Sequence, residues 1–79
     1  MDYQHILAIA ENKLKGKFDY IIKDIKNQIS SGSTGGEISS MVGKYLKDLK
    51  INNLTAYSLF ENDIQFYISE CKRHGLDVI

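Results

Sequence analysis

The sequence predicts an all-α protein, a small bundle of three to four amphipathic helices that forms a single helical domain over residues 1–79. Three observations predict this fold. The chain has only 79 residues, which leaves room for one small core. Apolar residues recur at steps of three and four along most of it, and no comparable stretch alternates with a period of two. Proline is absent, so helices must end at glycine or at capping residues.

The first apolar stripe runs through residues 3–29 and keeps its phase across Gly16. A single helix over residues 2–31, ~45 Å long, would satisfy it. The lysines around Gly16 and the acidic Asp19 after it are instead typical of one helix ending and another beginning. A long helix would also leave its N-terminal half uncovered in a monomer, although a dimer could cover it. We therefore expect two helices, over residues 2–15 and 18–31.

A glycine- and serine-rich stretch, SSGSTGGEISS at residues 30–40, precedes the next stripe. Its composition would suit a phosphate-binding loop, but no lysine follows the glycines and no strand precedes them. Thr34 and Glu37 have the spacing of a capping box, in which each side chain binds the other residue's amide. Gly32 stands where a left-handed residue would end the preceding helix. We interpret the stretch as a turn, with the next helix over residues 36–50.

The last apolar stripe predicts a helix over residues 56–74. Ser58 and Glu61 repeat the spacing of a capping box, and Thr55 is an equally good cap. Gly75 marks the end of the helix, because the three basic residues before it, Lys72, Arg73 and His74, place positive charge at the negative end of the helix dipole.

Charge and cysteine content exclude several classes of protein. The ten basic and ten acidic residues balance, which argues against a protein that binds a polyanion such as nucleic acid. No apolar run is long enough for a membrane span or a signal peptide. The one cysteine, Cys71, cannot form an intramolecular disulfide, and an unpaired thiol suits a reducing cytoplasm. We expect a cytoplasmic protein, and the excess of lysine, isoleucine and asparagine is typical of an AT-rich microbial or phage genome.

Few residues offer chemistry. His5 points away from the apolar stripe and His74 stands in a terminal turn, so neither has the partner that orients a general base. Cys71 and His74 make half of a zinc site, and no second pair of ligands follows. Cys71 also lies on the apolar stripe, where a free thiol behaves as a small hydrophobe. We therefore predict no catalytic residue, no cofactor and no metal.

DNA binding is the alternative that we keep open. Residues 37–74 could form two helices of a helix-turn-helix regulator, and Lys13, Lys15 and Lys17 could contact phosphates. A recognition helix, however, should expose basic or amide side chains near its start. The last helix begins instead with Glu61, Asn62 and Asp63, so nucleic acid is not the expected partner.

A protein partner is the expectation that remains. Leu59 and Phe66 stand seven residues apart, on a face that the core stripe of the last helix does not use. Exposed apolar residues bordered by charge are typical of a protein interface, although the bundle could instead bury more than one face of each helix. We predict a non-catalytic protein-interaction module, a regulator, inhibitor or immunity-type protein that could also be a homodimer. Its expected interface contains Leu59, Asp63, Phe66, Glu70 and Arg73, with Ile9 and Tyr20 from the first segment.

Overall fold

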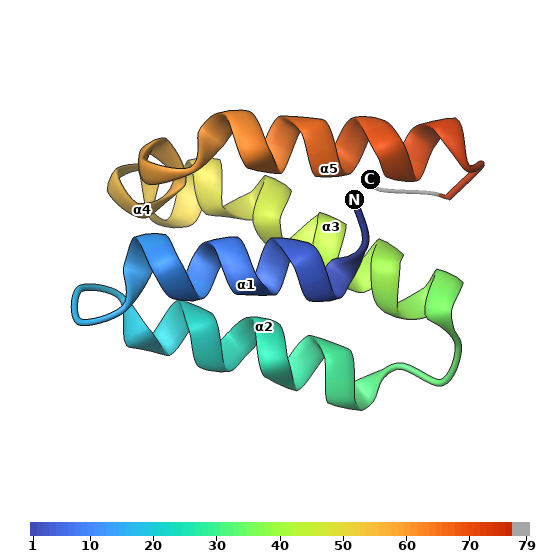
Figure 1. The fold of residues 1–79 in the computed structure, drawn as a ribbon, viewed down its shortest axis with the longest axis horizontal. Coiled ribbons are helices and arrows are strands. Elements are labelled where there is room, and N and C mark those ends of the chain that lie inside the picture. The colour runs from blue at the N-terminus through green and yellow to red at the C-terminus, as the bar shows by residue number, and fades with distance from the viewer. Residues whose placement is uncertain (77–79) are drawn as a thin grey trace.

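A computed structural model describes residues 1–76, which form five helices. The four longer helices pack along one another, and the short fourth helix lies at one end of the bundle (Figure 1). The prediction of an all-α fold is confirmed, whereas the predicted number of three to four helices is wrong. The helices in chain order are α1 (Tyr3–Leu14), α2 (Asp19–Ser31), α3 (Gly35–Asn52), α4 (Leu54–Leu59) and α5 (Glu61–Arg73).

The first two helices are separated by a tight turn at Gly16, as predicted, and the alternative of one long helix is wrong. The Asp2 carboxylate begins α1 by accepting a hydrogen bond from the amide of His5 at 2.8 Å. Gly16 has a φ of 83°, a left-handed conformation that glycine adopts without strain. The Asp19 carboxylate accepts a hydrogen bond from the Gly16 amide at 2.7 Å, so it holds the turn closed. The two helices consequently run antiparallel (Figure 1).

The turn before α3 is capped, but not entirely as predicted. The Thr34 hydroxyl accepts a hydrogen bond from the Glu37 amide at 3.1 Å, which confirms Thr34 as the N-cap. The Glu37 carboxylate accepts from the amide of Ser33 instead of Thr34, at 2.9 Å. Gly32 has a φ of −83°, so the prediction of a left-handed residue there is wrong. Glycine is needed at this position because a β-carbon would collide with the side chain of Ile38.

The fifth helix arises because the predicted last helix is divided at Phe60. Asn53 leaves the helical conformation, and its side-chain oxygen caps α4 by accepting from the Ala56 amide at 3.1 Å. Phe60 leaves it as well, with a φ of −145°, and is at once the C-cap of α4 and the N-cap of α5. The predicted caps at Thr55 and Ser58 are therefore wrong, and the Ser58 hydroxyl donates back to the carbonyl of Leu54.

All five helices contribute apolar side chains to one core. The stripes predicted from the sequence supply most of it. At the C-terminal end of α5, Gly75 has a φ of 76°, as expected of a glycine that ends a helix. None of the helices within residues 1–76 is both long and apolar enough to span a membrane. The largest fully buried side chains are Tyr67, Ile6, Leu14, Ile21, Ile25, Leu46, Ile64 and Val42.

Candidate interaction surface

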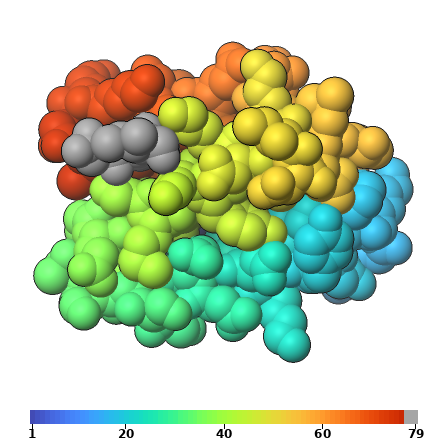
Figure 2. Space-filling view, turned by 180° about the vertical axis from the view of Figure 1, so that it is seen from behind, coloured from blue at the N-terminus to red at the C-terminus, as the bar shows by residue number. Residues whose placement is uncertain are grey.

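Large apolar side chains are exposed where α3 meets α4. The exposed fraction is 87% for Ile51, 58% for Leu54 and 54% for Tyr20. The side-chain amide of Asn53 donates a hydrogen bond to the Tyr20 hydroxyl at 2.8 Å, which ties the first turn of α2 to this junction. We call these four residues the α3–α4 corner. Figure 2 looks onto the side of the molecule where the end of α3 and α4 (yellow to gold) lie beside the start of α2 (cyan).

The local geometry of the chain explains why these residues face outward. Ile51 follows the buried Leu49 by two residues, and two residues turn an α-helix by about 200°, so Ile51 points away from the core. Leu54 is the first residue of α4, directly after Asn53 has left the helix. The core side of α4 is occupied by Ala56 and Tyr57, so Leu54 remains outside.

The structure divides the interface that the sequence predicts. Leu59 is 38% exposed and ends α4, whereas Phe66 is 54% exposed and lies in the middle of α5. The break at Phe60 stands between them, so the prediction that they share a face of one helix is wrong in its geometry. Asp63 is half-buried in the first turn of α5.

Glu70 and Arg73 belong to a different part of the molecule. The guanidinium of Arg73 lies 2.7 Å from one Glu70 oxygen, and the amino group of Met1 lies 3.4 Å from the other. Glu70 is thereby occupied by contacts within the chain.

The two predicted residues of the first segment also separate. Ile9 is partly buried and packs against the core, whereas Tyr20 is exposed on α2. The turn at Gly16 stands between them, so they lie on different helices.

Sequence reasoning did not identify Ile51 and Leu54. The signal for Ile51 was present, because it lies off the stripe that ends at Leu49. Leu54 carried no such signal, since its exposure depends on the break at Asn53.

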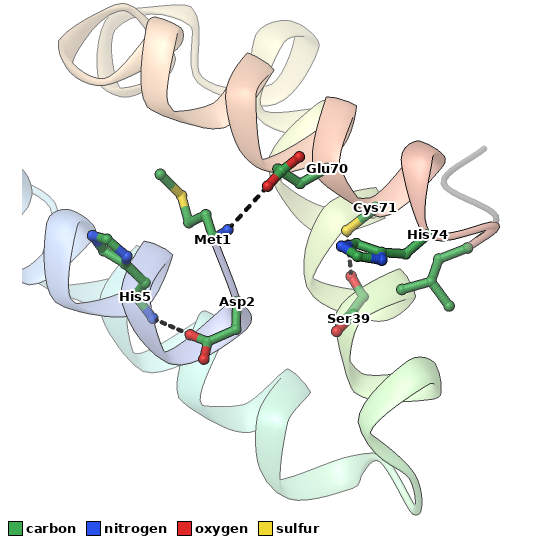
Figure 3. A pocket seen from close by; sticks show the side chains of 8 residues that line it. Met1, Asp2, His5, Ser39, Glu70, Cys71 and His74 are labelled. Carbon is green, nitrogen blue, oxygen red and sulfur yellow. Dashed lines mark hydrogen bonds and ion pairs between the residues drawn. The ribbon is translucent and has the colours of Figure 1, made fainter.

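A pocket lies near the N-terminus, between α1, α3 and α5 (Figure 3). Its volume is about 520 Å³. Polar and apolar groups both line it, and Asp2 and Glu70 have partners within the chain. The residues that line it are Met1, Asp2, His5, Ser39, Glu70, Cys71, His74 and Leu76.

Cys71 lines this pocket and is buried, as its place on the apolar stripe predicted. Its thiol lies 3.9 Å from the carbonyl oxygen of Ser39, which also accepts a hydrogen bond from the Tyr67 hydroxyl at 2.9 Å. Burial raises the pKa of the Cys71 thiol, and burial likewise raises the pKa of the Tyr67 hydroxyl. A thiol that keeps its proton is a poor nucleophile.

The two histidines enter the pocket from opposite sides (Figure 3). Within residues 1–76, neither imidazole takes part in a hydrogen bond or an ion pair. No group of three His, Cys, Asp or Glu side chains in that part of the chain is arranged to hold a metal ion. The pocket thus brings Cys71 and His74 to one place without giving either of them a partner for proton transfer.

No protein-family model matches the chain, and neither a curated protein nor a solved structure matches it.

Proposed function

We propose that the protein is a non-catalytic helical protein-interaction module, of the kind used as a regulator, an inhibitor or an immunity-type protein. One observation carries the proposal: Tyr20, Ile51 and Leu54 are each more than half exposed and meet at one corner. Single exposed apolar residues are ordinary on a protein surface. Several together are a surface that gains free energy when a partner covers it.

The size of that gain suits an interface. Fully burying a large apolar side chain contributes about 1.5–3 kcal/mol, and a few such side chains dominate most interfaces. A chain of 79 residues has a small core. Apolar side chains left outside this core do not contribute the free energy of burial unless a partner covers them.

A second surface, centred on Phe66 and containing the neighbouring Asp63, remains part of the proposal. Phe66 is exposed and aromatic, and aromatic side chains are enriched at interfaces. The proposal does not extend to DNA, because α5 begins with Glu61 and Asp63, whose carboxylates would repel phosphates. It places the protein in a reducing cytoplasm, where an unpaired thiol such as that of Cys71 is ordinary.

Affinity capture from extracts of the cells that produce the protein tests this function. We would compare the wild-type chain with Ile51→Gln, Phe66→Gln and Ala8→Gln, of which Ala8→Gln is the control on an exposed position of α1. We expect the wild type and Ala8→Gln to retain the same protein at a constant ratio, and Ile51→Gln to lose it. If only Phe66→Gln failed to retain the captured protein, the interface would lie on α5 instead of at the α3–α4 corner. Equal recovery with all four chains, or no recovered protein, would contradict the proposal.

A further inference from the structure

Exposed lysines border the α3–α4 corner. Lys47 and Lys44 precede Ile51 by four and seven residues, so they lie on the same side of α3. Lys50 precedes Ile51 directly. On the α2 side of the corner, Lys23 lines a groove together with Glu11 and Asp19, so it has acidic neighbours there and is not counted in the rim. The apolar corner therefore has a rim of three ammonium groups on its α3 side.

These lysines are not neutralised by the chain itself. The ion pairs within residues 1–76 join Met1 to Glu70, Lys26 to Glu11 and Arg73 to Glu70, and none includes a lysine of the rim.

Two acidic residues, Asp24 and Asp48, lie near the rim, and both are partly buried. Asp24 accepts a hydrogen bond from the Tyr45 hydroxyl at 2.7 Å, and Asp48 is half-buried. Three cations thus stand beside two anions, so the α3 side of the corner has a positive excess although the whole chain is neutral.

We infer that the α3–α4 corner binds an acidic protein surface, with apolar side chains at its centre and Asp or Glu carboxylates around them. The inference rests on the proposed function and adds the chemistry of the partner. Ile51 and Leu54 would enter the apolar centre, and the lysines would meet the carboxylates. Complementary charge at the rim of an interface raises the rate of association and excludes wrongly charged partners.

Other occupants fit the corner less well. A second copy docked by the same surface would bring lysines against lysines, and like charges oppose such pairing. Nucleic acid could contact the lysines, but the corner offers a single aromatic ring, that of Tyr20, and the described residues there include no arginine. Bases are held by stacking on aromatic rings or guanidinium groups.

The test uses the full chain and two synthetic amphipathic peptides that share the same leucine face. One peptide carries glutamates on its other positions, and its matched control carries lysines. In an NMR titration at low salt, where charges are least screened, we expect the glutamate peptide to shift the amide signals of Tyr20, Ile51 and Leu54. The lysine peptide should leave these signals in place.

Charge reversal completes the test. The double variant Lys44→Glu/Lys47→Glu should weaken binding of the glutamate peptide about tenfold and make the lysine peptide the better ligand. Lys13→Glu/Lys72→Glu, which changes net charge equally elsewhere, should have little effect. Equal binding of both peptides, no binding, or no response to the reversal would overturn the inference, and so would DNA or a second copy causing the same shifts.

The capture experiment keeps the two proposals distinguishable. If Ile51→Gln abolishes capture while the lysine reversal does not alter it, the corner is an interface and the inference of an acidic partner is wrong. If neither change alters capture, the α3–α4 corner is not the interface and the proposed function is contradicted there.

Discussion

The two ends of the bundle (Figure 1) differ in whether their surface side chains have partners within the chain. At the end where α1 begins and α5 ends, several polar groups in or beside the pocket have partners within the chain, as Met1 and Arg73 do at Glu70 and as Tyr67 does at Ser39. At the α4 end, apolar side chains such as Ile51 and Leu54 are left in water.

The difference separates a pocket that stabilises the fold from a surface that is available to a partner. A buried polar group without a partner is costly, and no buried side-chain nitrogen or oxygen of the described residues lacks one. The contacts of the buried polar groups at this end therefore stabilise the fold. Exposed apolar side chains such as Ile51 contribute little to the stability of the isolated chain, so the α3–α4 corner needs a different explanation.

The largest expected effect contrasts two phenylalanines. Phe60 is 2% exposed at the break between α4 and α5, whereas Phe66 is exposed on the outer side of α5. We expect Phe60→Ala to lower the free energy of unfolding by about 3–5 kcal/mol, because it leaves a cavity in the core. Phe66→Ala should change it by less than about 1 kcal/mol. Urea denaturation followed by circular dichroism measures both. Equal losses would show that Phe66 is part of the core.

The helix caps at the two ends give the next effect. Thr34 caps α3 and Asn53 caps α4, and each replacement by alanine should cost about 0.5–2 kcal/mol. Asn53 also holds Tyr20 through its amide nitrogen. Asn53→Asp retains the capping oxygen and removes that donor, so it should keep most of the stability and shift the NMR signals of Tyr20. If Asn53→Asp destabilised the protein as much as Asn53→Ala, the capping role would be contradicted.

Two tyrosine hydroxyls give the smallest contrast. The Tyr67 hydroxyl binds the Ser39 carbonyl inside the bundle, whereas the Tyr20 hydroxyl binds Asn53 at the surface. Tyr67→Phe should cost about 0.5–1.5 kcal/mol, the net value of a typical hydrogen bond. Tyr20→Phe should cost less than about 0.5 kcal/mol, because water replaces the exposed bond. Thermal melts of the two variants decide the point, and a larger loss for Tyr20→Phe would contradict the distinction between the two ends.

The sequence predicted much of the fold, because its apolar stripes and its glycine turn have direct physical consequences. The break at Gly16 could be predicted because glycine adopts a positive φ at little cost. The break at Phe60 could not, because the apolar stripe of Tyr57, Phe60 and Ile64 keeps its helical spacing through it. Neither glycine nor proline marks that position, so periodicity alone predicts one continuous helix.

The candidate surface was less predictable for the same reason. Helical spacing identified Phe66 and Tyr20 as residues off the core stripes, and both are exposed. It joined Leu59 to Phe66 only by assuming an unbroken helix. It could not bring Tyr20 to Asn53, since these residues are far apart in sequence and meet only when α2 packs against α3.

Site-specific photo-crosslinking tests the central claim, that the α3–α4 corner is the part of the molecule that a partner covers. A photoreactive amino acid would replace Ile51 in one chain and Ala8 in the other, and each would be irradiated in the cells that produce the protein. Both positions are exposed in the isolated chain. The account predicts one defined protein adduct from position 51 and none from position 8. No adduct from position 51, or the same adducts from both positions, would contradict it.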